Sequence, residues 1–173
     1  MSKKRLKIIG TIIAFILCFP FHGIYDKFPN TLTSIFFPVN ESIWEHMKIL
    51  FTSIMVSSVI QKIIIYIKKE DITNICFSNF IGAISSIPIF LILFLPIYYL
   101  FGENFPLTIL IMLITIIISQ IIAYRLLLKP NFKMEKKTIL LVILVYTIFT
   151  ILTYNPLNLD IFVDSTQCIC GLK

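Results

Sequence analysis

The chain has 173 residues, of which 58% are hydrophobic and only 14% are charged, and its formal net charge is +6. Its mean hydropathy is +0.94. Soluble domains have roughly a quarter of their residues charged, so this composition excludes an ordinary soluble domain and predicts an integral membrane protein whose partner is the lipid bilayer. A bilayer core about 30 Å thick needs roughly 20 apolar residues per helix, so we expect one membrane domain of residues 1–173 with about five spans.

Five apolar runs, bounded by charged residues, Pro or Asn, predict spans at about 7–22, 46–67, 77–101, 105–128 and 138–156, followed by a short tail at 157–173. Runs of this length form helices in lipid because a helix satisfies its own backbone groups. A barrel would show alternating segments of about ten residues instead. The fold class predicted is therefore an all-α membrane bundle. The first run resembles a signal peptide but lacks a small-residue cleavage site, so we expect it to be retained.

The basic residues sort between alternate loops. With the N-terminus in the cytoplasm, twelve of the fifteen fall inside and only Lys27, Lys48 and Lys173 fall outside. The inner set is Lys3, Lys4, Arg5, Lys7, Lys62, Lys68, Lys69, Arg125, Lys129, Lys133, Lys136 and Lys137. Short loops rich in Lys and Arg stay in the cytoplasm. A nucleic-acid-binding patch would not sort in this way, so nucleic acid is excluded as a partner. The Ile-, Lys- and Asn-rich usage suggests an AT-rich bacterial genome, so the bilayer expected is a bacterial cytoplasmic membrane, with the N-terminus inside and the C-terminus outside.

The acidic residues and the histidines sort in the opposite direction. The residues predicted to lie outside are His22, Asp26, Glu41, Glu45, His46, Glu103, Asp160 and Asp164, whereas only Glu70, Asp71 and Glu135 lie inside. Most groups capable of acid, base or ligand chemistry thus meet at one extracytoplasmic face. Cys168 and Cys170 also lie there, and they can bind a soft metal, pair with another chain or stay free. A disulfide between residues only two apart would be strained.

The segment VNESIWEHMKILF, residues 39–51, combines several polar groups with the only tryptophan. Pro38 disfavours helix before it. The second span can therefore begin at Asn40 as N-cap or at Ser42, which forms a capping-box pattern with Glu45. In the structural interpretation these residues cap the helix and Trp44 anchors it at the interface.

A binding interpretation uses the same residues. Glu41, Glu45, Lys48 and Thr52 are predicted to share one stripe of the helix, because residues three and four apart are neighbours. Lys48 can pair with Glu45, and two carboxylates one turn apart can share a cation or a proton. The predicted binding residues are Asn40, Glu41, Trp44 and Lys48.

A metal interpretation draws on residues from several segments. His22, Glu41, Glu45, His46 and Asp164 offer the nitrogen and oxygen ligands that zinc or a similar divalent ion takes. The spacing is not that of zincins, because two histidines four residues apart are absent. In this interpretation His22, His46, Glu41 and Asp164 are the candidate ligands, and Glu45 is the candidate catalytic base.

Three stretches, FHGIY, PVNESIWEHMKILF and YNPLNLDIFVD, resemble an uncharacterised family of small multi-pass bacterial membrane proteins, domain of unknown function 6512. The resemblance implies hallmark positions at His22, Tyr25, Asn40, Glu41, Ser42, Trp44, Glu45, His46, Lys48, Phe162 and Asp164. The family pattern continues after the aspartate with a proline and ends in Tyr-Gly. Here Ser165 follows Asp164 and the chain ends in CICGLK, with Gly171 at about the expected distance. The resemblance strengthens the site and implies no activity.

Three functions fit these patterns. The first is a module that binds a cation or polar ligand at the extracytoplasmic start of the second helix. The second is a metal-dependent hydrolase or transferase acting at the outer interface, with water activated by the metal. The third is a structural or accessory membrane protein. Ionisable residues at a membrane are functional candidates by default, so binding is the leading hypothesis, narrowly ahead of catalysis. Oligomeric state is not readable from the sequence.

Overall fold

The computed structural model describes residues 1–102, 104–164 and 170–172. The chain is 77% helical, with no strand among these residues. Five helices are long and apolar enough to cross a membrane: α1 (Lys3–His22), α4 (Ile43–Ile67), α5 (Ile75–Phe101), α6 (Phe105–Leu127) and α7 (Glu135–Tyr154). The predicted all-α class is confirmed, and each predicted span coincides with one helix apart from a few residues at its ends. The predictions for Glu103, Ser165, Cys168 and Lys173 concern residues outside the described part.

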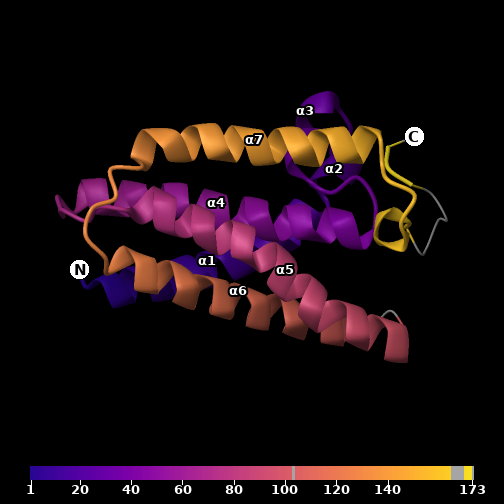
Figure 1. Ribbon diagram of the computed structural model, residues 1–173, viewed down its shortest axis with the longest axis horizontal. Coiled ribbons are helices and arrows are strands. Elements are labelled where there is room, and N and C mark those ends of the chain that lie inside the picture. The colour runs from indigo at the N-terminus through magenta and orange to yellow at the C-terminus, as the bar shows by residue number, and fades with distance from the viewer. Residues whose placement is uncertain (103, 165–169, 173) are drawn as a thin grey trace.

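The five long helices run alternately up and down the bundle (Figure 1). Helix α1 packs against α4 and α6, while α5 packs against α4, α6 and α7. Helix α4 lies at the centre and is more buried than the other four. Small residues allow these close contacts, as expected between helices in lipid. For example, the hydroxyl of Ser57 in α4 donates to the backbone carbonyl of Gly10 in α1 at 2.7 Å. The middle of α4 is therefore held against α1.

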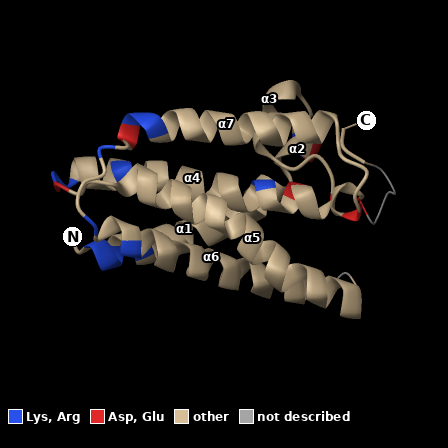
Figure 2. Cartoon of the chain, viewed as in Figure 1, with Lys and Arg blue, Asp and Glu red and all other residues tan. Residues whose placement is uncertain are grey.

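Charge separates the two ends of the bundle (Figure 2). The basic end carries Lys3 to Arg5 at the start of α1, Lys68 and Lys69 after α4, Arg125 near the end of α6, and Lys136 and Lys137 in α7. The opposite end, here called the site end, carries His22 and the start of α4. This separation agrees with the twelve-to-three sorting, while the direction of the bundle in a membrane stays a prediction. Lys7 departs from the loop pattern because its ammonium is buried and donates to Asn79 Oδ1 at 2.6 Å.

Short elements cover the site end. Between α1 and α4 the chain forms α2 (Ile24–Lys27) and α3 (Thr31–Phe36), and the 3₁₀ helix η1 (Asp160–Phe162) follows α7. Helix α3 packs against α7, and η1 packs against α4. Beyond η1, Val163 forms an isolated β-bridge with Cys170, whose thiol is free.

The end of the chain returns to the last turn of α7. The Leu172 N–H donates to the Thr153 carbonyl at 3.1 Å. Gly171 has a φ of +65°, and a Cβ there would lie 2.5 Å from the Thr153 oxygen. Both observations require glycine at this position, because a side chain would be strained and would clash. Residues 171 and 172 thereby lie against the last turn of α7 at the site end.

Candidate metal centre

Helix α4 begins at Ile43 with Ser42 as its N-cap. The Ser42 hydroxyl accepts the Glu45 N–H at 3.4 Å, and the Asn40 side chain accepts the Ser42 N–H at 3.0 Å. Phe37, which precedes Pro38, is extended with φ −121° and ψ 155°, as the proline requires. Of the two predicted helix starts, the structure has the one at Ser42.

The predicted stripe that joined Glu41 to Glu45 is wrong. Glu41 precedes the N-cap and is not helical, so helical spacing does not apply to it. Its backbone N–H donates to Asp164 Oδ2 at 3.1 Å, which connects Glu41 to the residues that follow η1. The two carboxylates consequently belong to two separate groups of side chains.

The first group is a buried ion pair. Lys48 Nζ lies 2.6 Å from Glu45 Oε2, and the two side chains are 0% and 1% exposed. The predicted pairing of Lys48 with Glu45 is confirmed. The ammonium also donates to the Ser34 carbonyl at 3.0 Å and to the Thr153 hydroxyl at 2.8 Å.

The Glu45 carboxylate is equally well satisfied. Its Oε1 accepts the Thr153 hydroxyl at 2.7 Å, and its Oε2 accepts the Val39 N–H at 3.2 Å. The pair therefore joins α4 to the segment after α3 and to α7. A buried charge pair is tolerated when its remaining hydrogen-bonding positions are filled, as they are here. This geometry favours a structural role for Glu45 and Lys48, and it leaves neither side chain open to a ligand.

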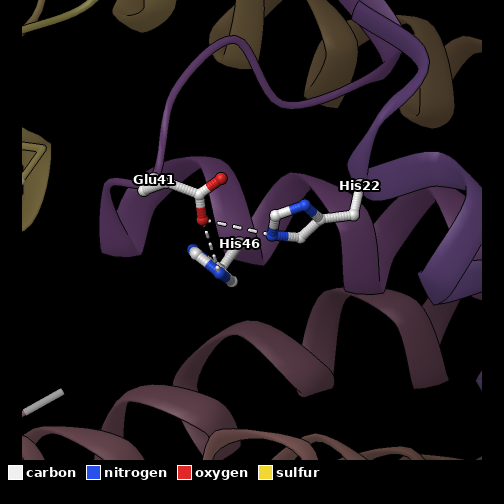
Figure 3. A group of neighbouring side chains, drawn as sticks. All are labelled: His22, Glu41 and His46. Atoms are coloured by element: carbon white, nitrogen blue, oxygen red, sulfur yellow. Dashed lines mark ion pairs between the residues drawn. The ribbon is translucent and has the colours of Figure 1, made fainter. Parts of the chain in front are cut away.

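The second group consists of His22, Glu41 and His46. Figure 3 shows both imidazole rings directed at the same carboxylate oxygen of Glu41. That oxygen, Oε2, lies 3.1 Å from His22 Nε2 and 3.7 Å from His46 Nε2. One potential ligand atom from each residue lies within 4.8 Å of the others, and no second group of this kind is found in the described part of the chain. The structure thus brings together three of the four predicted metal ligands.

Each residue of this trio is positioned by a different element. His22 is the last residue of α1, and His46 lies in the first turn of α4. Glu41 lies in the segment between α3 and α4. The His46 Nδ1 lies 3.0 Å from the Ser42 carbonyl, which orients the ring and leaves Nε2 toward Glu41. Such a hydrogen bond on the second ring nitrogen is typical of histidines that bind metals.

The electrostatics of the trio favour an ionised carboxylate. The hydrogen bond with His22 lowers the pKa of Glu41, and partial burial opposes that shift without reversing it. The side chains remain partly accessible, at 41% for His22, 35% for Glu41 and 14% for His46. Glu41 is therefore an anion within reach of solutes at neutral pH.

A cavity of about 360 Å³ lies beside the trio. His22, Glu41 and His46 line it together with residues from α1 and α6, and its walls are mainly apolar. The lining includes Cys18, Thr108 and Met112, and the sequence patterns had not indicated any of these three as site residues. Thr153 was also missed, because it is one of several threonines in the apolar run of α7 and no sequence pattern distinguishes it from the others.

The other predicted residues have structural contacts. The Asn40 amide donates to the Gly171 carbonyl at 3.0 Å, so this residue connects the tail to the start of α4. The Trp44 ring packs against Phe149 and Phe162, with centroids 5.2 and 4.9 Å away. Asp164 is fully buried and reaches Glu41 through the backbone N–H. It is not part of the trio of converging ligand atoms.

The donor set of the trio suits a particular class of ion. Imidazole nitrogen and carboxylate oxygen are ligands of zinc, which commonly has three protein ligands and an open fourth position in catalytic sites. The cavity borders all three side chains, so an ion held by them would have an open side. The arrangement can bind a divalent metal and present it to a second molecule.

Comparison with known proteins places the chain in a family. A family model described as a family of unknown function (DUF6512) matches residues 1–172, so the chain belongs to that family. Comparisons with curated proteins and with solved structures found no match. The family assignment confirms the predicted resemblance over nearly the whole chain and attaches no activity to the trio.

Proposed function

We propose that this membrane protein binds a divalent transition-metal ion such as zinc through His22, Glu41 and His46. The observation that carries the proposal is the convergence of these three ligand atoms within 4.8 Å of one another. In a tetrahedral zinc site with bonds of about 2.0–2.2 Å, two ligand atoms lie about 3.3 Å apart. The separations of 3.1 and 3.7 Å from Glu41 Oε2 bracket that value, and the ligand atoms of the two histidines lie within 4.8 Å of each other.

The charge pattern supports an extracytoplasmic location for the metal centre. The basic end matches the cytoplasmic side of a membrane protein, and the trio lies at the opposite end. In this proposal the protein resides in a bacterial cytoplasmic membrane and binds an ion that arrives from outside. The Glu45 and Lys48 pair supports the scaffold and does not bind the ion.

The metal content of the purified protein tests the proposal. Wild type, His46→Ala and Glu41→Gln are purified in detergent and analysed by inductively coupled plasma mass spectrometry after equilibration with zinc. We expect near-stoichiometric zinc in wild type and its loss in both variants, because removing one of three ligands leaves an incomplete site.

Glu135→Gln is the matched control because Glu135 forms an exposed pair with Lys62 at the basic end. It should retain the metal. Zinc bound equally by all four proteins would contradict the assignment of the ligands. A folded wild type that binds no added zinc would favour the structural alternative, in which the trio is only a set of hydrogen bonds.

The open side of the trio favours hydrolysis as a second candidate function. Zinc with three protein ligands lowers the pKa of a bound water to about 7 and so generates a nucleophile. The cavity provides space for a substrate beside that position. Glu45, the predicted general base, lies in the buried pair, so an active protein should tolerate its loss as long as it folds. Product release from an ester or phosphoester lipid by wild type, and not by His46→Ala, would establish this activity.

A further inference from the structure

We infer that the metal centre binds the phosphate monoester headgroup of an anionic membrane phospholipid whose acyl chain occupies the adjoining cavity. This inference rests on the proposed metal binding and specifies its ligand. The trio supplies the charged groups of the cavity lining and Thr108 adds one hydroxyl, while Cys18, Phe19, Ile109 and Met112 form an apolar wall. An amphiphile, with one charged end and one apolar chain, matches this division.

The position of the cavity indicates that its occupant comes from the bilayer. The cavity lies between α1 and α6, and its rim includes Phe19 at 50% and Phe105 at 73% exposure. Phe19 continues a stripe of exposed apolar residues along one side of α1, formed by Ile8, Ile12 and Ile16. Because α1 and α6 are long and apolar enough to span a membrane, an exposed apolar rim between them is suited to contact with lipid.

The apolar wall selects among possible ligands. A lipid chain is about as apolar as the side chains around it, so moving from the bilayer into the cavity requires no dehydration. A small water-soluble ligand at the same metal would leave the wall of Ile109 and Met112 uncovered. At about 360 Å³ the cavity has the size of a ligand pocket and exceeds what a headgroup alone would fill.

The charge of the loaded site selects the headgroup. A divalent ion with its three ligands, two neutral imidazoles and the ionised Glu41, carries one net positive charge, and Asp164, which binds the Glu41 backbone, lies outside this ligand set. Phosphate oxygens are hard anionic ligands that complete such a coordination sphere. The same chemistry is present in a soluble phosphate monoester, so phosphatidic acid and glycerol 3-phosphate share the headgroup contact and differ only in the chain.

Photo-crosslinking in nanodiscs tests the inference. The full chain is incorporated with zinc into phosphatidylcholine nanodiscs containing a trace of phosphatidic acid that carries a diazirine in one acyl chain. We expect crosslinks at the cavity wall in α1 and α6, at least about tenfold more than from diazirine phosphatidylcholine, because one charge-assisted contact of about 1.4 kcal/mol or more gives that factor. Chelation of zinc and Glu41→Gln should each remove the preference.

Two tryptophan variants on α6 separate cavity binding from surface contact. Met112→Trp fills the cavity and should reduce phosphatidic acid crosslinking to the phosphatidylcholine level while zinc content stays unchanged. Leu110→Trp is the matched control, since Leu110 is 51% exposed on the outside of α6 and does not line the cavity. It should crosslink like wild type. Equal crosslinking in Met112→Trp and wild type would overturn the inference.

Further outcomes distinguish this inference from the metal proposal. Competition by glycerol 3-phosphate as effective as that by phosphatidic acid would show that the chain contributes nothing, and would overturn the lipid assignment while the metal site stands. Bound zinc without any preference for phosphatidic acid would do the same. Absence of zinc from wild type in the same samples would refute the proposed metal site, and the lipid assignment would fall with it.

Discussion

Glu45 and His46 are neighbours in the chain, but they belong to two groups of side chains. The groups differ in solvent exposure and in how many of their polar atoms have partners within the protein. The Glu45–Lys48 pair is essentially inaccessible, and its charged atoms have protein partners from three elements. The trio around His46 is partly exposed and borders a cavity. Adjacent residues on a helix point about 100° apart, so one turn of α4 serves both groups. The comparison teaches that a dense polar motif can hold a scaffold on one side and offer ligands on the other.

The largest expected effect comes from breaking the buried pair. Lys48→Met leaves the Glu45 carboxylate buried without its counter-charge, which should lower the free energy of unfolding by about 3–5 kcal/mol. Thermal or denaturant unfolding in detergent micelles, followed by circular dichroism, measures the change. Lys62→Met removes the exposed partner of Glu135 and should cost about 1 kcal/mol or less.

The double variant Glu45→Gln with Lys48→Met sharpens this result. Replacing both charges removes the unpaired carboxylate, so we expect most of the lost stability to return. If Lys48→Met were as stable as Lys62→Met, the buried pair would not hold the site end together. Retained zinc binding by the folded double variant would show that the two groups act independently.

The next largest effect concerns zinc binding by the trio of His22, Glu41 and His46. Zinc at about one hundred times its dissociation constant should stabilise the wild type by about 2.7 kcal/mol, because the ion binds only the folded state. Melting curves with and without zinc measure this shift, which should vanish in Glu41→Gln. A zinc-dependent shift of the same size in that variant would place the ion elsewhere.

A smaller effect is expected where the buried pair meets α7. Thr153→Val removes a hydroxyl that donates to Glu45 and accepts from Lys48, and should reduce the free energy of unfolding by about 1–3 kcal/mol. Thr147→Val is the control, because Thr147 is exposed on the same helix and bonds only within it, to the Ile143 carbonyl. Equal stability of the two variants would show that Thr153 does not contribute to the network.

The sequence predicted the fold well because length and hydropathy dominate in lipid. The five helices follow directly from apolar runs that must satisfy their own backbone groups. The pairing of Lys48 with Glu45 was also predictable, because residues i and i+3 are neighbours on any helix.

The site was less predictable because it depends on where the helix begins and on distant residues. Asn40 and Ser42 were both plausible caps, and the difference of two residues decided whether Glu41 faced Glu45 or the histidines. The contact of Thr153 with the buried pair spans more than one hundred residues of sequence and has no local pattern. Lys7 was placed at the cytoplasmic end of the first span, where a charge is normally exposed, whereas its ammonium is buried and donates to Asn79.

Asp164 gives the smallest and most discriminating change. The sequence predicted it as a ligand, whereas its observed contact holds the Glu41 backbone at 3.1 Å from outside the trio. Asp164→Asn keeps an oxygen that accepts this N–H and removes one negative charge near the ion. We therefore expect zinc affinity to fall by about tenfold, the lower end of the range for residues that support a ligand. Isothermal titration with zinc measures the affinity. A loss as complete as that of His46→Ala would make Asp164 a fourth ligand, close the open position of the site, and favour metal storage or structure over presentation of the ion to a lipid.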